Sequence, residues 1–539
     1  MKRMLAIALA ALLVFGLTAC GGTIEKADTP VASAATGASG ETAQTKQVVV
    51  GVSMGATTMD PAHEYEWDAE MMLHSVYPSL VTSDYADESK ILPCVASEWV
   101  ISDDGLTYTF TLNHGIKFTT GKELKASDVA FSLNRLKGAA GNPSFLLSSV
   151  ESVEATGDYE VTVTLSEPNP ALLNILTRAS AGVYDAEVAQ ANGATCDSSD
   201  AGQAYFDTTS IGCGPYMISS FNSGSELVLV KNPDSYFPAG NVDTYIIRNI
   251  ADSATQQMEL EGGDLDFALD LTADQTALLE GNESIKLVSF DTMDIFFLGL
   301  NASEEYGKEL ANPTVREAIR YAIDYPGLCA LAGNGATTPA GIIPKGFLGY
   351  AGETTITRDV EKAKALLTEA GYPDGITFSM GVIPDMAPDG VSFMTLAQKV
   401  QADLAEAGIT VNIEPQEVAV YLEGYRDGKQ QSVMCHWGPD YNDSNNQLAF
   451  LPGNTVGLRL GWTAEMDPEL AELGQKASVE TDSDKRAELF TEIQKQMDEK
   501  NAPAVVLLQP GKTWAVSSRL KNLTVSAAFS FDFVSLDVQ

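Results

Sequence analysis

Residues 393–413 read FMTLAQKVQADLAEAGITVNI, and this stretch determines the fold class. Its apolar residues recur every three or four positions as far as Ala407, which predicts an amphipathic helix that stops at Gly408. Residues 409–413 then alternate between apolar and polar types, as a half-buried strand does. A helix, a glycine and a strand in this order are typical of an α/β layer.

The same pattern occurs on both sides of this stretch. Asp359 precedes a helical apolar pattern, Gly371 stands where a left-handed cap belongs, and Pro373 prevents continuation. Further on, Asp484 is expected to cap another helix, and residues 505–508 read as a buried strand. The first half of the chain is instead rich in strand patterns. These cover residues 48–52, 107–112, 159–165, 227–230 and 245–250.

Size and charge limit the possible functions. The chain has 539 residues, which is too many for one hydrophobic core, so we expect at least two lobes. It carries 73 acidic against 33 basic side chains, a formal charge of −40. Such a surface argues against binding to nucleic acid or anionic lipid, because both need basic faces. A cationic or zwitterionic ligand remains compatible with it.

The N-terminal residues indicate export. A short basic start is followed by an apolar run, residues 5–17, that is too short to span a bilayer. This run ends at Cys20 in a sequence that resembles a bacterial lipobox, which implies a signal peptide over 1–19 and a lipid on Cys20. Residues 20–46 have the composition of a flexible tether. We therefore expect attachment to the outer face of the cell membrane through this lipid alone.

Cysteine and histidine offer no metal site. Five cysteines follow Cys20, and the closest two, Cys196 and Cys213, are one possible disulfide among several. No spacing suggests zinc, and the four histidines are scattered. We expect no metal and no cofactor.

One catalytic motif needs weighing. Residues 51–55, GVSMG, match the G-x-S-x-G elbow with Ser53 as nucleophile. The elbow requires a helix directly afterwards, whereas residues 56–61 read as a loop with a proline. A hydrolase using Ser53 is therefore the weaker alternative, and we expect a protein that is not an enzyme.

A series of segments resembles one family in order along the chain. TTMDPA (57–62), DGLTYTFTL (104–112), GCGPY (212–216) and VREAIRYAID (315–324) are similar to motifs of the family 5 extracellular solute-binding proteins of ABC importers, the peptide and nickel type. Further matches lie at residues 77–81, 96–99, 115–121, 125–129, 231–236 and 359–375.

The resemblance implies an α/β fold of the periplasmic-binding-protein type II, with two lobes, a hinge between them and an extra β-rich subdomain. Lobe I would comprise residues 47–81, 211–300 and 501–539, with residues 82–210 as the inserted subdomain. Lobe II would comprise residues 301–500. A ligand would sit in the cleft, and the closed, monomeric receptor would deliver it to the membrane subunits of an ABC permease.

The resemblance also implies site residues. In WGPDYN (437–442), Asp440 matches the family's aspartate that takes the ammonium group of a bound peptide. Trp437 would form a pocket wall, with Gly438 and Tyr441 beside it. From the first lobe, Tyr65 and Trp67 would contribute cleft contacts.

One departure concerns the opposite end of the ligand. Oligopeptide binders of the family often carry an arginine shortly before this tryptophan, and residues 432–436 contain none. Arg426 is the nearest basic candidate besides Lys429. The resemblance as a whole makes a short peptide the first expectation for the ligand, although this departure leaves its length open. Nickel, a metal chelate, haem or another small solute, and a chaperone or signalling role, remain alternatives.

Overall fold

The computed structural model describes residues 46–527 and 530–539. These residues belong to one compact unit, Thr45–Gln539. The expected signal peptide 1–19, the lipidated Cys20 and all but the last residue of the tether 20–46 lie outside the described residues. No helix among the described residues is long and apolar enough to cross a bilayer.

The first sheet is built around β1 (Gln47–Val52), whose residues Val48, Val50 and Val52 are completely buried. Strand β1 pairs in parallel with β10 (Thr244–Asn249) and β11 (Phe267–Ala268). The seven strands run in the order β12-β18-β11-β1-β10-β9-β8. The other members are β8 (Tyr216–Asn222), β9 (Glu226–Lys231), β12 (Ile285–Asp291) and β18 (Gly511–Ser517), with helices α6 (Ser253–Gly262) and α7 (Ala273–Leu278) nearby.

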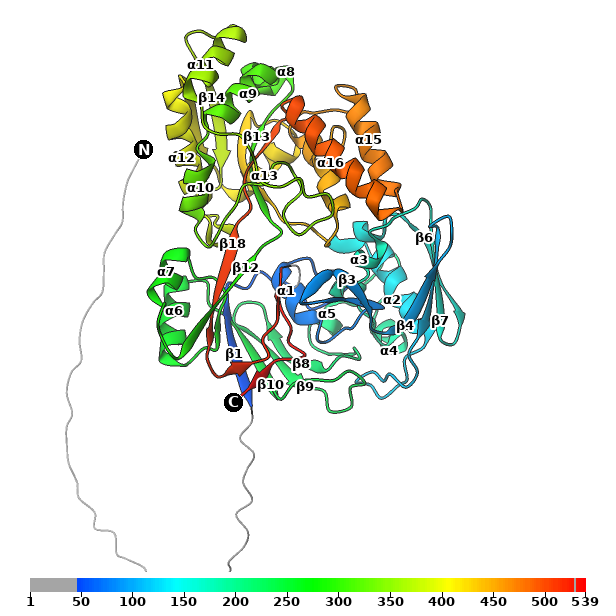
Figure 1. Ribbon diagram of the computed structural model, residues 1–539. Coiled ribbons are helices and arrows are strands. Elements are labelled where there is room, and N and C mark those ends of the chain that lie inside the picture. The colour runs from blue at the N-terminus through cyan, green and yellow to red at the C-terminus, as the bar shows by residue number, and fades with distance from the viewer. Residues whose placement is uncertain (1–45, 528–529) are drawn as a thin grey trace, which may run out of the picture. The chain divides into compact units, whose positions relative to one another are not determined.

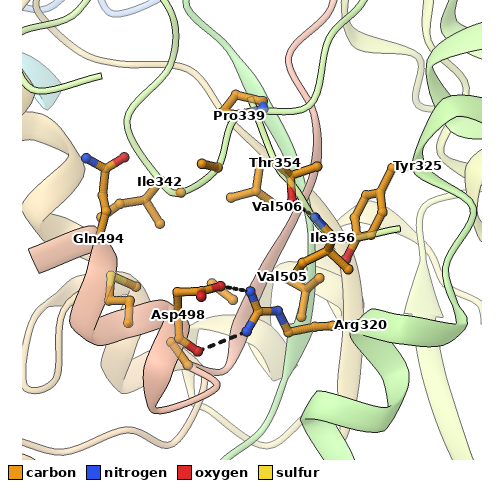
Figure 2. A pocket seen from close by; sticks show the side chains of 15 residues that line it. Arg320, Tyr325, Pro339, Ile342, Thr354, Ile356, Gln494, Asp498, Val505 and Val506 are labelled. Carbon is orange, nitrogen blue, oxygen red and sulfur yellow. Dashed lines mark hydrogen bonds and ion pairs between the residues drawn. The ribbon is translucent and has the colours of Figure 1, made fainter. Parts of the chain in front are cut away.

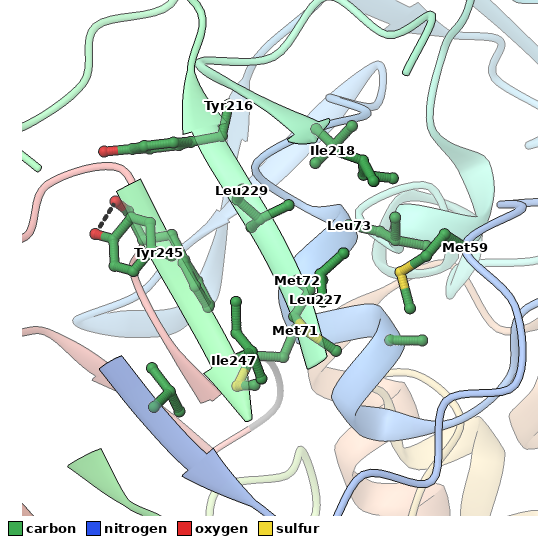
Figure 3. Close-up of a cluster of buried hydrophobic side chains, with 14 of the residues drawn as sticks. Met59, Met71, Met72, Leu73, Tyr216, Ile218, Leu227, Leu229, Tyr245 and Ile247 are labelled. Atoms are coloured by element: carbon green, nitrogen blue, oxygen red, sulfur yellow. Dashed lines mark hydrogen bonds between the residues drawn. The ribbon is translucent and has the colours of Figure 1, made fainter. Parts of the chain in front are cut away.

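Helix α1 (Trp67–Leu73) packs on this sheet and reaches the cleft at its first residue. Met72 and Leu73 lie in one buried cluster with Leu227 and Leu229 of β9 (Figure 3). Because these side chains are completely or almost completely buried, they fix the helix and the preceding turn.

A subdomain with its own core follows in the chain. Strands β4 (Ala96–Ile101), β5 (Thr107–Leu112), β7 (Glu160–Leu165) and β6 (Val150–Gly157) form a four-stranded antiparallel sheet in that order. Its hydrophobic cluster extends from Leu80 to Cys213. The remaining elements are β2 (Val81–Asp84), β3 (Asp87–Pro93), α2 (Ala126–Gly138), α3 (Leu172–Ile175), α4 (Ala186–Ala191) and α5 (Gln203–Phe206).

The later half forms the predicted α/β layer. Helix α12 (Phe393–Glu406) ends before Gly408, and β15 (Ile409–Pro415) follows it directly. Asp359 caps α11 (Val360–Glu369) by accepting a hydrogen bond from the Lys362 amide. The five strands run in the order β15-β14-β16-β13-β17. The other strands are β13 (Ile295–Leu300), β14 (Ile376–Val382), β16 (Ser432–Trp437) and β17 (Ala504–Leu508).

Helices pack around this second sheet (Figure 1). They bury two large clusters of apolar side chains, which make the core of this half. They are α8 (Glu304–Gly307), α9 (Pro313–Ala322), α10 (Tyr325–Ala332), α13 (Val418–Arg426), α14 (Thr455–Arg459), α15 (Pro468–Val479) and α16 (Ser483–Glu499).

The second sheet extends past the expected lobe II, residues 301–500, on both sides. Strand β13 lies before this range and β17 after it, and they pair with each other. All six residues of β13 are buried, so this strand belongs to the interior of the second lobe. The chain therefore passes between the two large sheets at residues 292–294 and again at residues 509–510.

One local expectation was wrong, and one possibility left open by the sequence is not realised. Helix α16 is capped by Asp482, whose side chain accepts a hydrogen bond from the Lys485 amide, rather than by Asp484. Cys196 is exposed while Cys213 is buried, and both are free thiols, so the possible disulfide between them is not formed. The five cysteines in the described part of the chain are all unpaired.

A small cavity inside the second lobe is structural. Figure 2 shows Arg320 of α9 paired with Asp498 of α16 beside it. Its volume is about 40 Å³, which is close to the space of one water molecule. It is therefore too small to hold an organic ligand.

Candidate functional site

The candidate site is a cavity of about 620 Å³ between the lobes. Tyr65 and Trp67 line it from the first lobe, together with Lys512 of β18. Asp389 and Asp440 line it from the second lobe. Its volume falls within the usual range for a small-molecule site.

Asp440 is held from both sides of this cavity. It lies just after β16, and its Oδ1 accepts a hydrogen bond of 2.5 Å from the Tyr65 hydroxyl of the other lobe. Its Oδ2 accepts a second bond, of 3.0 Å, from the Asn446 side-chain amide. Burial and the nearby Asp440 carboxylate raise the pKa of the Tyr65 phenol, so Tyr65 remains a hydrogen-bond donor.

Trp437 supports Asp440 and does not line the main cavity. Its indole Nε1 donates to Asn446 Oδ1 at 2.8 Å, so Asn446 connects the ring to the carboxylate. Its ring packs edge-on against Phe450, with centroids 5.6 Å apart. Trp437 lines a neighbouring cavity of about 560 Å³, which shares Asp440 and Tyr441 with the main one.

Tyr65 and Trp67 present uncovered aromatic surface to the cavity. Their exposed fractions are 41% and 45%, high for such large rings. The Tyr65 ring is supported by an edge-on contact with Phe145, and Lys512 Nζ lies 5.0 Å from the centre of the Trp67 ring. Rings that protein atoms leave uncovered in a cavity are available to cover a ligand.

Gly438 and Tyr441 also line the cavity, as expected. A Cβ atom on Gly438 would lie 2.8 Å from Asp294 Oδ1, so only glycine permits this carboxyl group to approach the end of β16. Tyr441 is partly buried against the inserted subdomain, and burial raises the pKa of its phenol.

Arg426 is not brought to this site. It lies exposed at the last position of α13 and is absent from the cavity wall. The basic residue that the inserted subdomain contributes from the loop after α3 is Arg178, whose Nε lies 3.3 Å from Glu70 Oε1. No local pattern around Arg178 marks it, because only the packing of α1 against this loop brings it to the cavity.

A second charged group in the wall also escaped sequence reasoning. Lys512 Nζ lies 3.2 Å from Asp389 Oδ1, and Asp294 lies beside Asp389. Burial, together with Asp389, raises the pKa of Asp294 well above its usual range. Burial alone would also raise the pKa of Asp389, but Lys512 and the neighbouring Asp294 lower it. The pair therefore holds a proton on Asp294.

The described residues fit the catalytic and metal alternatives poorly. Ser53 follows β1, but the next helix begins only at Trp67, so the strand-to-helix elbow is absent there. Among the described residues, one group with metal-ligand spacing occurs, Asp60, His63 and Asp200. The guanidinium of Arg135 already binds both of these carboxylates, which leaves no role for an ion.

The sequence was compared with family models. The model of the bacterial extracellular solute-binding proteins, family 5 (middle region), matches residues 90–457. The chain belongs to this family. Family 5 proteins are binding proteins rather than enzymes, which is consistent with the lack of a nucleophile elbow.

Curated relatives in family 5 carry one name repeatedly. The chain is 28% identical over 517 residues to the glutathione-binding protein GsiB of Salmonella paratyphi A, covering 91% of this chain and 94% of that protein. It is 30% identical over 373 residues to GsiB of Escherichia coli O1:K1, covering 68% and 69% of the two chains.

Solved structures of other proteins share the fold. HbpA2 from Haemophilus parasuis is 24% identical and superposes with a TM-score of 0.79, covering 92% of this chain and 100% of its own. DppA from Helicobacter pylori, in complex with the peptide STSA, is 25% identical with a TM-score of 0.74, covering 91% and 98%. These likenesses confirm the two-lobed α/β periplasmic-binding-protein fold expected from the sequence.

Proposed function

We propose that this family 5 protein binds short peptides in the 620 Å³ cavity and delivers them to an ABC permease. Asp440 takes the α-ammonium group of the peptide, while Tyr65 and Trp67 cover its first residues. The observation that carries the proposal is the position of Asp440, whose carboxylate meets a side chain of the opposite lobe across the cavity.

Physical chemistry supports the role of Asp440. A cation in a closed cavity loses water, and this cost is offset only when a fixed charge or dipole replaces the water. The Tyr65 hydroxyl and the Asn446 amide fix both oxygens of Asp440. A carboxylate that is oriented before the ligand arrives pays little entropy on binding.

The named relatives support a peptide ligand. Glutathione is a tripeptide, and the GsiB proteins are named as its binding proteins. DppA of Helicobacter pylori was solved with a peptide bound. The aromatic wall and the single oriented carboxylate of this chain suit the backbone and the charged end of such a ligand.

The cellular setting belongs to the same proposal. Lipidation of Cys20 would anchor the receptor to the outer face of the cell membrane, and the tether 20–46 would let it reach the permease. We propose that it acts there as a monomer. The hinge for ligand capture would be the two chain crossings at residues 292–294 and 509–510.

The first prediction tests the Asp440 assignment. The tripeptides Ala-Lys-Ala, Ala-Gln-Ala and Ala-Glu-Ala serve as probes, and we expect at least one to raise the melting temperature by mass action. Asp440→Asn should weaken binding of such a peptide by about 30-fold or more, because truncating one partner of a buried charge pair costs about 2–5 kcal/mol.

The matched control is Asp427→Asn, which removes an exposed carboxylate that pairs with Lys429 outside the cavity. Its ligand-induced shift should equal that of the wild type. A shift that survives undiminished in Asp440→Asn would remove Asp440 from the site.

A further inference from the structure

The wall of the main cavity is strongly acidic. Its described residues include six carboxyl groups and only two permanently charged bases, Arg178 and Lys512. His436 also lines it, but burial lowers the pKa of this imidazole, so it adds no positive charge near neutral pH. The carboxyl groups are those of Glu66, Glu70, Asp270, Asp294, Asp389 and Asp440.

Both bases are already engaged by carboxylates. Arg178 pairs with Glu70 at 3.3 Å, and Lys512 pairs with Asp389 at 3.2 Å. The hydrogen-bond partners of the Asp440 carboxylate, the Tyr65 hydroxyl and the Asn446 amide, are neutral. The cavity wall therefore carries a surplus of negative charge, which favours cationic over anionic ligands.

A second acidic position lies close to Asp440. Asp294 Oδ1 stands 2.8 Å from where a Gly438 Cβ would be, and Gly438 and Asp440 are separated by one residue, Pro439. The two carboxyl groups thus flank the same short turn. The Asp389 Oδ2 atom is buried beside Asp294, and among the described residues it has no N–H or alcohol donor.

We propose that the cavity selects peptides with a second positive charge, binding the α-ammonium group at Asp440 and a lysine or arginine side chain at the Asp294–Asp389 pair. The inference rests on the proposed function and narrows its ligand class. A cation entering beside the pair replaces the proton held on Asp294, which leaves to solvent. The other titratable groups around the pair are Lys512 of β18, His436 of β16 and Asp270 after β11.

The proposed preference for a second positive charge argues against glutathione, the ligand in the name of the GsiB relatives. Glutathione carries two carboxylates and one ammonium group, so its net charge near neutral pH is negative. A cavity with a negative surplus and no uncommitted base in its described wall repels such a ligand.

The test compares the three tripeptides of equal length by isothermal titration calorimetry. We expect the wild type to bind Ala-Lys-Ala about 10-fold or more tighter than Ala-Gln-Ala, and Ala-Glu-Ala and glutathione more weakly still. Titrations in buffers of different ionisation enthalpy should show more protons released with Ala-Lys-Ala than with Ala-Gln-Ala.

Asp294→Asn is the decisive variant, because asparagine has the shape of the protonated carboxyl group and should preserve the fold. It should bring the ratio of the Ala-Lys-Ala and Ala-Gln-Ala affinities close to one. The control Asp427→Asn, outside the cavity wall, should keep the wild-type ratio.

The outcomes are separable. If none of the tripeptides binds the wild type, the proposed function fails as well. If the lysine and glutamine peptides bind equally, the charge selection alone is wrong. If the preference persists in Asp294→Asn, the second positive charge is not bound by this pair.

Discussion

At the scale of single residues, a second carboxyl pair shapes the first-lobe wall of the cavity. Glu64 is buried just before α1, and Glu70 lies within that helix. Burial, together with Glu70, raises the pKa of Glu64 well above its usual range. Burial would also raise the pKa of Glu70, but Arg178 and His74 outweigh it and lower this pKa to about 2. The two carboxyl groups therefore titrate far apart, and Glu64 keeps its proton to a higher pH than an ordinary glutamate does.

This pair predicts a pH dependence of stability. Because the folded pKa of Glu64 is raised above the value of 4.5, its contribution is fully present below pH 4.5 and is lost as the pH rises toward the folded pKa. In Glu64→Gln this loss disappears. Relative to the wild type, the variant should gain about 1.4 kcal/mol per pH unit above 4.5 until the folded pKa is reached.

Urea unfolding of both proteins at a series of pH values, from about pH 4 to neutral and mildly alkaline pH, measures this difference. The informative quantity is how the difference in free energy of unfolding between variant and wild type changes with pH. The substitution itself adds an offset to this difference that does not depend on pH. Curves that run parallel across the range would show that Glu64 is not buried as a neutral acid.

The same scale shows what sequence reasoning can reach. Asp440, Gly438 and Tyr441 were predictable because they belong to one short segment whose order carries the information. Arg178, Asp294 and Lys512 come from three distant segments, and only tertiary packing places them in the same wall. The spacing of these three residues along the chain does not predict that they lie close together.

At the scale of elements, two glycines show how the α/β layer of the second lobe is joined. Gly375 precedes β14 with φ of +87°, and a Cβ atom there would lie 1.9 Å from the carbonyl oxygen of Gly408. Gly408 precedes β15, which starts in register with β14 at Ile376 and Ile409. The close contact sets the start of this parallel pair.

We therefore predict unequal costs for two alanine substitutions. Gly371→Ala should destabilise by about 1–2 kcal/mol, because φ is +94° but no atom lies within 4 Å of the new methyl group. Gly375→Ala carries the same strain and also displaces Gly408, adding about 1–3 kcal/mol. Chemical denaturation measures both, and equal losses would contradict the role of the contact.

Element boundaries were predictable where the pattern is continuous. The run from α12 through Gly408 to β15 confirms the prediction, because helical and strand periods meet at one glycine. The cap of α16 was predicted at Asp484 but lies at Asp482. Aspartate is a good cap at either position, so residue type alone does not distinguish the two. Strands β13 and β17 were predicted to lie in lobe I but belong to the sheet of the second lobe. An apolar strand pattern predicts that a strand is buried, but it does not show which sheet the strand joins.

At the scale of the whole molecule, few polar contacts join the lobes across the cleft. They include Tyr65 with Asp440, Asn442 with Glu88, and Lys512 with Asp389. Each contributes about 0.5–1.5 kcal/mol as a hydrogen bond, somewhat more when charged. Gln509 joins the two chain crossings by donating to the Thr292 carbonyl oxygen at 2.6 Å. Because few polar contacts hold the lobes together across the cleft and the two chain crossings are bonded to each other, the lobes can move apart in solution about these crossings.

Small-angle X-ray scattering can test this motion. Adding a saturating tripeptide should lower the radius of gyration, because the ligand contributes contacts to both lobes only when they are closed. Asp440→Asn at the same peptide concentration should show little or no decrease. An identical radius of gyration with and without bound peptide would exclude closure as the mode of capture.

The sheet of the first lobe has a consequence for biosynthesis. Strand β1 near the beginning and strand β18 near the end both pair with β11. As the exported chain emerges on the outer side of the membrane, this sheet cannot be completed until residues 511–517 have emerged. The inserted subdomain and most of the second lobe can by then have formed their own cores. Folding should therefore proceed from the middle of the polypeptide outward, with the early strand β1 waiting for its last partners until nearly the whole chain has emerged.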